Sequence, residues 1–430
     1  MDILNDLEQR GLIKQASNIE SLSNTLSNDS ISLYCGFDPT ADSLHVGSLL
    51  PMITLMRFKN AGHNPIALIG GATGMIGDPS FKSSERTLND DKTVIGFQQK
   101  IQQQIENITQ LDTVNNNNWC SNMNMIDFLR DVGKHFSIND MLRKESVRQR
   151  IEREDQGISF TEFSYMLIQS MDFLKLFENE NCKLQIGGSD QWGNITAGMD
   201  LIHKVHGNDK DVFSLTFPLI TKSDGTKFGK TESGTVWLSP EKTTPFQFFQ
   251  FWLNTPDSDI ANFFKWFSLK DISEINHILN EDENRKLQGQ KPKAQELLAI
   301  EMTQLVHGKS GVKSAQAITN ALFNGSQTHL EALEESDFEE LVNSPDSFII
   351  DDNIFFNMDL PQLIQEAGLA KSKTEARRFI QGNSISINDT KITDVKFDLN
   401  ETKEHLFFNK FFILKRGKKN KTLISINKKV

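Results

Sequence analysis

Tyrosine is almost missing from this sequence, which has 31 phenylalanines but only two tyrosines, Tyr34 and Tyr165. Two ordinary core tyrosines are one interpretation, and two hydroxyls kept for a specific use are the other. Cysteine is scarce as well: Cys35, Cys120 and Cys182 are odd in number, far apart and without a C-x-x-C pair. This scarcity argues against a disulfide framework and a cysteine zinc site, and it favours a protein of the reducing cytoplasm.

Long hydrophobic runs are also missing. None approaches the roughly 18 to 20 apolar residues that cross a bilayer, so no membrane association is expected. The N-terminal sequence MDILNDLEQR is acidic and lacks the layout of a signal peptide. A net charge of −11 argues against a general nucleic-acid binder. Residues 371–421 nevertheless carry 13 Lys and Arg against 6 Asp and Glu, which predicts that a polyanion is bound at one particular surface.

Apolar runs at residues 31–37, 65–69 and 183–186 have the length of buried strands. A helix is predicted over about 45–60, between the first two runs, and another helix follows the turn after the third. Strand, helix and strand in this order predict a parallel sheet with crossover helices. All three runs end in turns rich in glycine and polar residues. These turns should meet at the carboxyl ends of the strands, where open α/β folds bind ligands.

With 430 residues the chain is long enough for two or three domains. The predicted fold class is α/β, with a Rossmann-like parallel-sheet domain, an α-helical domain and a small α+β domain. The predicted boundaries are 1–222 for the sheet domain, about 85–165 for a helical insertion in it, 223–236 for a mobile loop, 237–325 for the helical domain, 326–352 for a polar, acidic linker, and 353–430 for two short helices followed by a strand pair. The run 246–267, rich in Phe and Trp, is predicted to be core rather than a platform for stacked bases.

Two segments have the composition of a phosphate site. His45 and Gly47 lie at the predicted N-terminus of a helix, where backbone N–H groups and the helix dipole favour an anion. The segment Lys227-Phe228-Gly229-Lys230-Thr231 places two lysines three residues apart. Taken singly, a capping or core histidine and a solvated surface turn are the preferred explanations of these features. Together they predict that the two segments hold a nucleotide triphosphate from opposite sides.

Longer stretches carry a specific resemblance. The stretch YCGFDPTADSLHVGS resembles the first signature of class I aminoacyl-tRNA synthetases, and KFGKT resembles their second signature, usually written KMSKS. The blocks GGATGMIGDPS, GISFTEFSYMLIQSMDF and LQIGGSDQWGNITAG are similar to those of bacterial tyrosyl-tRNA synthetases. The closing segment resembles the S4-type RNA-binding domain of the same enzymes. The resemblance covers nearly the whole chain, and it makes 237–325 the domain on the anticodon side.

The resemblance implies a role for each matching residue. The phenol hydroxyl of a bound tyrosine would be hydrogen-bonded by Tyr34 and Asp172. Its ammonium group would be held by Asp78, Tyr165 and Gln169, with Asn116 as a further helper. The ribose or the activated carboxyl group would be contacted by Asp38, Asp190 and Gln191. The nucleotide would be flanked by Gly36 and Gly47. The phosphates would be gripped by Thr40, His45, Lys227, Lys230 and Thr231, with Lys82 and Arg86 as a second mobile basic element.

These implied roles agree with elementary chemistry. Tyr165, Gln169 and Asp172 are spaced i, i+4, i+7, which puts them on one helix face. An ammonium group needs a carboxylate and neutral acceptors, and these residue types supply them. A buried polar pair that expects a phenol rejects phenylalanine, because both partners would be left unpaired. The interpretation of Tyr34 and Tyr165 as ordinary core residues is thereby disfavoured.

The implied activity is a tyrosine–tRNA ligase that works in two steps. The tyrosine carboxylate attacks the α-phosphate of ATP, pyrophosphate leaves, and the terminal ribose of tRNA(Tyr) then attacks the acyl carbon of the adenylate. ATP would come with Mg²⁺, and no protein-bound metal or organic cofactor is expected. A homodimer is implied as well, with its contact region in the helical insertion around 121–165. The basic stretches KSKTEARRF and KRGKKNK are either solvated charge or, as the resemblance favours, phosphate contacts for RNA.

One position departs from the family pattern H-x-G-H, because Ser48 stands where the second His is expected. One neutral hydrogen bond to the nucleotide is then at stake, which is worth roughly 0.5–1.5 kcal/mol. Pro51 also removes the helix bond to the carbonyl of Gly47. Two alternatives stay open. A tryptophanyl-tRNA synthetase shares the fold but has no use for a hydroxyl-binding pair, and a non-catalytic RNA-binding protein could retain the scaffold with an altered signature.

Overall fold

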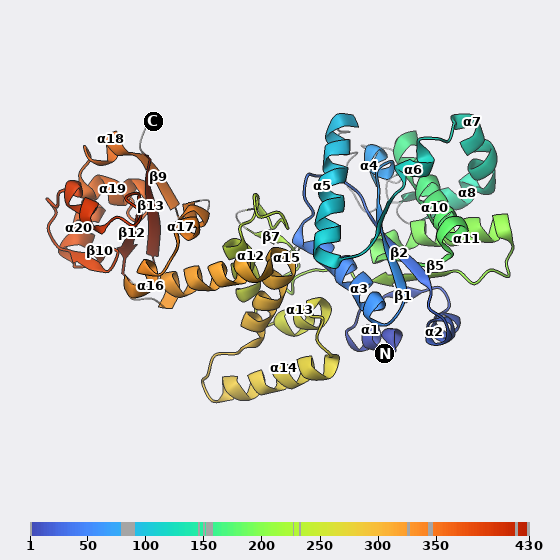
Figure 1. The fold of residues 1–430 in the computed structure, drawn as a ribbon, viewed down its shortest axis with the longest axis horizontal. Helices are drawn as coiled ribbons and strands as arrows, with labels where there is room; N and C mark the ends of the chain where they lie inside the picture. Colours follow the sequence, from blue (N-terminus) through green and yellow to red (C-terminus); the bar gives the residue numbers. More distant parts are fainter. Residues whose placement is uncertain are drawn as a thin grey trace. The chain divides into compact units, whose positions relative to one another are not determined.

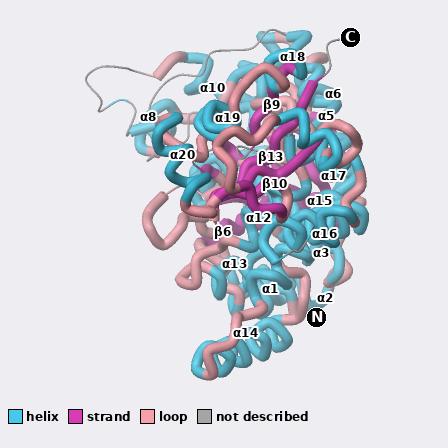
Figure 2. Tube along the Cα trace, turned by 90° about the vertical axis from the view of Figure 1, so that its left-hand side faces the viewer, coloured by secondary structure: helices cyan, strands magenta, loops and turns pink. Residues whose placement is uncertain are grey.

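The computed structural model describes residues 2–78, 91–144, 147–148, 151, 158–226, 228–231, 234–324, 327–342, 347–417 and 420–427 (Figure 1). The chain divides into two compact units. The first consists of Met1–Ser239 with Thr255–Leu298, and the second of Pro240–Asn254 with Ala299–Val430. Each unit is described separately, and Figure 2 shows which segments are helix and which are strand.

A six-stranded sheet forms the centre of the first unit, in the order β1-β6-β5-β2-β3-β4. The strands are β1 (Gln15–Ala16), β2 (Ser32–Phe37), β3 (Asn64–Ile69), β4 (Thr113–Asn115), β5 (Cys182–Gly188) and β6 (Phe213–Phe217). All pairs are parallel except β1 with β6. The predicted strands at 31–37, 65–69 and 183–186, and their parallel pairing, are therefore confirmed. Strand order reverses at β2, which lies between β3 and β5, and a crevice at the carboxyl ends is expected at such a point.

Helices α3, α5, α10 and α11 pack against strands of this sheet, as expected for parallel strands that are continuous apolar runs. The helices of the first unit are α1 (Ile3–Gln9), α2 (Ile19–Asn28), α3 (Leu49–Asn60), α4 (Thr73–Ile76), α5 (Asp91–Thr109), α6 (Asn117–Cys120), α7 (Met125–Asp127), α8 (Ile138–Arg143), α10 (Phe160–Glu180), α11 (Trp192–His206), α13 (Ile260–Phe267) and α14 (Ile272–Leu287). Helix α10 begins at its N-cap Ser159, whose side chain accepts the Glu162 N–H, and ends at Asn181 in the left-handed conformation.

The helical insertion is shorter than the predicted 85–165. Strand β4 pairs with β3 inside that range, and α10, which begins at Phe160, packs on α11 against the sheet. The apolar signal of β4 is only three residues long, and the following NNNN stretch has the composition of a loop. The sequence pattern therefore concealed a strand of the central sheet.

Helices α13 and α14 belong to the first unit, although 237–325 was predicted as one helical domain. The reason lies in two arginines. Arg10 donates to the carbonyls of Lys265, Ser268 and Lys270 over 2.8, 3.1 and 2.6 Å. Arg57 donates to the carbonyls of Trp266 and Ser268 over 2.7 and 2.8 Å. Both side chains are buried, so they tie the end of α13 to α1 and α3.

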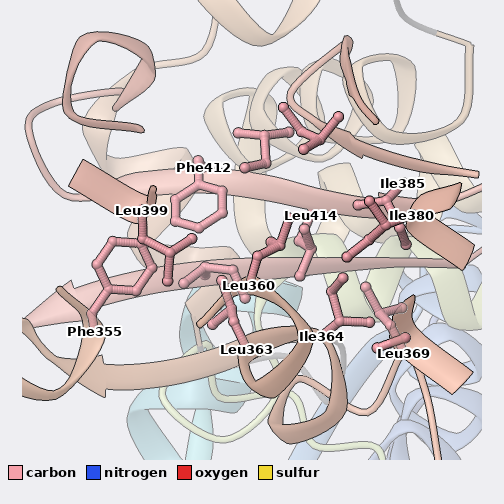
Figure 3. Close-up of a cluster of buried hydrophobic side chains, with 14 of the residues drawn as sticks. Phe355, Leu360, Leu363, Ile364, Leu369, Ile380, Ile385, Leu399, Phe412 and Leu414 are labelled. Carbon is pink, nitrogen blue, oxygen red and sulfur yellow. The ribbon is translucent and has the colours of Figure 1, made fainter. Parts of the chain in front are cut away.

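The second unit contains helices and a separate five-stranded sheet in the order β11-β10-β12-β13-β9. Its strands are β9 (Ser347–Asp351), β10 (Ile385–Ile387), β11 (Thr390–Ile392), β12 (Phe411–Arg416) and β13 (Asn420–Asn427). Its helices are α12 (Pro245–Leu253), α16 (Gln327–Glu331), α17 (Glu335–Val342), α18 (Asp352–Phe355), α19 (Leu360–Glu366) and α20 (Lys373–Gln381), while α15 (Ala294–Thr319) spans the division. Figure 3 shows the core in which α19 and α20 pack on the sheet through Leu360, Leu363, Ile364, Ile380, Phe412 and Leu414.

The predicted linker 326–352 is wrong as a description of this segment. It contains α16 and α17, and its last residues form β9, which pairs in parallel with β13. Helix α17 buries Phe338, whose ring stacks on Phe407 at 5.1 Å and on Phe411 at 5.3 Å. An acidic composition suggested a linker, but four of its acidic residues, Glu335, Asp337, Glu339 and Glu340, belong to α17, which buries Phe338 and Leu341. The predicted pair of short helices followed by a strand pair, α19, α20, β10 and β11, is confirmed.

The run 246–267 is core, as predicted: Phe248, Trp252, Phe264 and Phe267 have no exposed surface. Within the described ranges, no helix combines the length and the apolar character needed to span a membrane. The three cysteines are unpaired.

Candidate active site

A cavity of about 530 Å³ opens at the carboxyl ends of β2, β3, β5 and β6. Most of the predicted site residues line it, although they come from distant parts of the sequence. They are Tyr34, Gly36, Asp38, Thr40, His45, Gly47, Ser48, Asp78, Tyr165, Gln169, Asp172, Asp190 and Gln191. Lys230 and Thr231 form the short strand β7 (Lys230–Thr231), which pairs with β8 (Gly234–Thr235). Lys82, Arg86 and Lys227 lie outside the described residues.

Two buried polar side chains, Tyr34 and Asp172, line the cavity. Tyr34 is fully buried against the ring of Phe173, and its hydroxyl has no hydrogen-bond partner among the described residues. Asp172 is also buried, and its carboxylate accepts from Trp119 Nε1 at 2.9 Å and from Asn116 Nδ2 at 3.0 Å. A buried hydroxyl without a protein partner is costly, so this part of the cavity suits a polar ligand group.

Burial controls the charge of both groups. It raises the pKa of Tyr34 well above 10, and the Asp172 charge adds to this shift, so the Tyr34 hydroxyl stays neutral. Burial also raises the pKa of Asp172 to about 7, although the hydrogen bonds from Asn116 and Trp119 oppose the shift. The pair therefore offers one neutral hydroxyl and one carboxylate that ionises near neutral pH.

A chain of hydrogen bonds runs from Asp172 to Tyr165. Asn116 also donates to Thr73 Oγ1 at 3.1 Å, and Thr73 donates to Asp38 Oδ1 at 2.7 Å. Tyr165, one turn before Gln169 on α10, donates its hydroxyl to the other oxygen of Asp38 at 2.7 Å. The structure thus places Asn116 beside Asp172, for which the resemblance implies contact with a phenol hydroxyl.

Carboxylates gather at the middle of the cavity. Gln191 donates to Asp78 Oδ2 at 2.8 Å and to Asp190 Oδ2 at 3.3 Å, and Asp38 lines the same wall. The buried Oε1 of Gln169 has no hydrogen-bond partner among the described residues. Negative charge together with an open acceptor suits a cationic ligand group. No group of three or more His, Cys, Asp or Glu that could hold a metal ion occurs in the part of the chain that the structure describes.

The turn His45–Ser48 forms the outer edge of the cavity. His45 Nδ1 accepts the N–H of Gly47 at 3.0 Å, which leaves Nε2 as the nitrogen that carries hydrogen in the neutral ring. Burial lowers the pKa of His45, so the ring is neutral at pH 7. A side chain at position 47 would come within 2.8 Å of the His45 ring, and glycine is required there for this reason. Ser48 lines the cavity, and its side chain makes no capping bond to α3.

Backbone hydrogen bonds join this turn to the lysine loop, residues 223–236, which contains the sequence KFGKT. Val46 N–H donates to the carbonyl of Val236, and Val236 N–H donates to the carbonyl of Gly229, both over 2.9 Å. Gly229 has φ +79°, and a side chain there would approach Val46 Cγ1 to 2.7 Å. The two segments predicted to grip phosphate are therefore neighbours in the structure.

Several lining or supporting residues escaped the sequence analysis. Gln185 lines the cavity from β5, and its buried Oε1 has no partner among the described residues; a glutamine inside an apolar strand was the available signal. Cys35 also lines the cavity, and burial raises the pKa of its thiol to about 12. Thr73 and Trp119 act through their bonds to Asp38 and Asp172, and only the fold brings these pairs together.

Comparisons with known proteins show which sequences and folds this chain is similar to. A family model described as tRNA synthetases class I (W and Y) matches residues 26–324, and one described as the tyrosine--tRNA ligase SYY-like C-terminal domain matches residues 348–424. The chain is 49% identical over 430 residues to a tyrosine--tRNA ligase of Escherichia coli, covering 98% of each chain. A C-terminally truncated mitochondrial tyrosyl-tRNA synthetase of Aspergillus nidulans matches with a TM-score of 0.68 at 29% identity, over 75% of this chain and 94% of that one. A tryptophanyl-tRNA synthetase of Plasmodium falciparum shares the fold alone, with a TM-score of 0.52 at 15% identity over 72% of this chain and 84% of that one.

Proposed function

The chain belongs to the tyrosine–tRNA ligase family of class I tRNA synthetases, and on this premise we propose that its cavity binds L-tyrosine and ATP, forms tyrosyl-adenylate and passes the tyrosine to tRNA(Tyr). The observation that carries the proposal is the buried pair Tyr34 and Asp172. The Tyr34 hydroxyl, which has no partner among the described residues, and the oriented Asp172 carboxylate fit a phenol. The fold alone cannot select the amino acid, because a tryptophanyl-tRNA synthetase shares it.

In this proposal, bound tyrosine completes the hydrogen bonds that the free site leaves open. Its phenol O–H donates to Asp172 and accepts from Tyr34. Its ammonium group lies among Asp78, Tyr165 and Gln169, where the carboxylate supplies charge and the open Gln169 Oε1 supplies an acceptor. Bound phenylalanine would leave the Tyr34 hydroxyl and the Asp172 carboxylate without the phenol as a hydrogen-bond partner. An unsatisfied buried polar group costs more binding free energy than the loss of one hydrogen bond.

ATP would occupy the outer part of the cavity, beside Gly36, Thr40, Gly47, Ser48 and Asp190. A side chain at position 36 would meet nothing within 4 Å, so the glycine leaves space over the strand end. His45 would donate from Nε2 to a phosphate oxygen, which suits a neutral imidazole whose Nδ1 already accepts a hydrogen bond. The proposed basic partners of the phosphates are Lys230 in β7 and, outside the described residues, Lys82, Arg86 and Lys227, with Thr231 as a further contact.

The chemistry needs no protein nucleophile. A tyrosine carboxylate oxygen bonds to the α-phosphorus of Mg–ATP, the bond to the β-phosphate oxygen breaks, and pyrophosphate leaves. A ribose hydroxyl at the end of the tRNA then attacks the acyl carbon and AMP leaves. Catalysis rests on alignment of the two substrates and on donors aimed at the phosphates, where negative charge builds up in the transition state.

The second unit would bind tRNA through the basic stretch 371–421, which is exposed at Lys371, Lys391 and Lys396. A homodimer would form through the insertion. The contact region 121–165 implied by the resemblance exposes the large apolar residues Met125, Ile126, Leu129, Ile138, Leu142 and Phe160. Sedimentation at a mass near the 48.8 kDa of one chain would reject the dimer. We place the protein in the cytoplasm, where its three free cysteines stay reduced.

Pyrophosphate exchange with each amino acid in turn tests the central proposal. Tyrosine-dependent exchange is expected, followed by charging of tRNA(Tyr) when the tRNA is added. Tryptophan-dependent exchange would indicate the other branch of the fold. RNA binding without exchange for any amino acid would indicate a non-catalytic protein on a synthetase scaffold.

A further inference from the structure

Phe228 lies between the two lysines of the sequence KFGKT, yet it is not a residue of a solvated turn. Its exposed fraction is 8%. Its ring lies 5.3 Å from that of Phe267 in a stacked arrangement and 5.0 Å from that of Phe263 in an edge arrangement. Both partners are buried and lie one turn apart on the same face of α13. A ring held from two sides constrains the backbone that carries it.

The lysine loop touches α13 at a second place. Ser223 N–H donates to Asp259 Oδ1 at 3.0 Å, and its hydroxyl lies 2.8 Å from that of Ser258. Asp259 is the residue immediately before α13. The loop is thus attached to the start of the helix through Ser223 and to its buried face through Phe228, while the Gly225 N–H donates to the carbonyl of Lys222 in the turn that contains Ser223.

Helix α13 is in turn attached to the helix that begins at the signature turn. Arg57 lies in the last turn of α3, and its guanidinium donates to Trp266 and Ser268 carbonyls at the end of α13. At the other end of α3, Val46 is bonded through Val236 to Gly229, the residue after Phe228. These contacts connect four elements in a ring: the turn His45–Ser48, α3, α13 and the lysine loop. The Phe228 side chain supplies the contact between the lysine loop and the buried face of α13.

We propose that Phe228 is a positioning residue for adenylate formation: its ring, docked on Phe263 and Phe267, sets the backbone that carries Lys230 relative to His45. The inference rests on the proposed grip of the lysine loop on the ATP phosphates. Phe228 does not line the cavity, so it would act only through the loop. A purely structural anchor would contribute stability but would leave the placement of Lys230 unchanged.

The test compares Phe228→Ala, Phe228→Leu, Lys230→Ala and the Phe228→Ala/Lys230→Ala double variant, all in the full chain. Tyrosine-dependent pyrophosphate exchange gives kcat and the KM for tyrosine, and thermal unfolding gives Tm. Phe228→Ala should lower kcat about 10- to 100-fold, since a misplacement of about 1 Å costs that much, while the KM for tyrosine stays within about twofold. Phe228→Leu should recover most of kcat. The double variant should be close to Lys230→Ala alone, because a displaced loop matters little once its lysine is gone.

Phe177→Ala is the matched control. The ring centroid of Phe177 lies 5.4 Å from that of His206, and Phe177 does not line the cavity. This variant should lower Tm without lowering kcat. Normal kcat in Phe228→Ala, beside an impaired Lys230→Ala, would overturn the inference and leave the proposed function standing. Losses that multiply in the double variant would also overturn it. If Lys230→Ala keeps full kcat, the phosphate role itself is wrong and the inference falls with it. Should Phe228→Ala not fold, Phe228→Leu carries the same comparison, with a smaller loss that must again vanish in the Lys230→Ala background.

Discussion

Trp119 donates its indole N–H to Oδ1 of Asp172 over 2.9 Å, and this bond joins the insertion to the face of α10 that lines the cavity. Asn116 donates to the other oxygen from the same insertion. Two donors from one segment fix the plane of the carboxylate and favour its ionised form. Removal of either donor should therefore raise the pKa of Asp172 and change its charge near neutral pH.

Trp119→Phe keeps the ring and removes this donor. We expect the pKa of Asp172 to rise further and tyrosine to bind up to about tenfold more weakly, since a hydrogen bond to a charged group is lost. The value of kcat should change little, because the phosphate end is untouched. Tyrosine titration at pH 7 and at pH 8.5 checks this, and the higher pH should restore part of the affinity. Trp192→Phe, at the start of α11 and outside the cavity wall, is the control.

The pH dependence of tyrosine binding follows from the same carboxylate. Because burial raises the pKa of Asp172 to about 7, the free site is mostly protonated in weakly acidic solution. An ionised carboxylate accepts the phenol hydrogen more strongly, so affinity should increase severalfold from about pH 6 to about pH 8. Equilibrium binding across this range measures it, and Asp172→Asn should abolish the slope. An unchanged slope in that variant would assign the titration to another group.

Stability should show the opposite dependence on pH. The folded-state pKa of Asp172, about 7, lies above its ordinary value of 3.8, so folded protein holds a proton that the unfolded chain has lost between those pH values. The contribution of this group to stability is therefore present at low pH and is lost as pH rises through 7. Chemical denaturation at several pH values, compared with Asp172→Asn, isolates it. A contribution of Asp172 to stability that increases with pH would contradict the raised pKa of this buried carboxyl group.

Tyr34→Phe should separate stability from binding. The change removes a buried hydroxyl without a partner among the described residues, so the free protein should be as stable as before or more stable by about 1 kcal/mol. Tyrosine should bind more weakly, by roughly 0.5–1.5 kcal/mol, and discrimination against phenylalanine should fall. Unfolding curves and exchange assays with both amino acids measure these effects. A large loss of stability would show that the hydroxyl already has a partner.

Ser48→His restores the family pattern at the signature turn. Ser48 lines the cavity, and its side chain is not engaged in capping α3, so the substitution exchanges one donor for another. We expect adenylate formation to change by less than about tenfold, the value of one neutral hydrogen bond. Single-turnover kinetics of adenylate formation measure this. A change of about a thousandfold in either direction would show that the turn itself has been rearranged.

Removing the C-terminal sheet should weaken tRNA charging far more than adenylate formation. A deletion of residues 353–430, the domain predicted from sequence, would leave β9 without its partner β13, so the cut belongs before Ser347. The cut also removes Phe407 and Phe411, on which the ring of Phe338 stacks, so the shortened chain carries Phe338→Ser to remove this ring. Exchange and charging are then measured side by side. Equal losses in both assays would contradict a role confined to tRNA.

Local signals allowed much of the site to be predicted. A strand ending in glycine and polar residues is a local pattern, and the carboxyl ends of parallel strands must meet, so the three turns that follow these strands could be predicted to lie together. The roles of Tyr34, Asp78 and Asp190 within them came from the resemblance to class I synthetases. The helix face of Tyr165, Gln169 and Asp172 follows from the 3.6-residue period. The short strands β4 and β9 were missed, because three to five residues carry too little periodicity to reveal their pairing with β3 and β13.

The sequence by itself determined the fold class and the strands β2, β3 and β5, since those depend on local polarity and spacing, while the resemblance to class I synthetases indicated most residues around the cavity. Only the tertiary structure decided which polar groups are satisfied. It placed Trp119 and Asn116 on Asp172, left the Tyr34 hydroxyl without a partner among the described residues, and packed Phe228 on α13. These contacts join segments that lie far apart in the chain, and they follow from side-chain packing and desolvation in three dimensions, which no local pattern records.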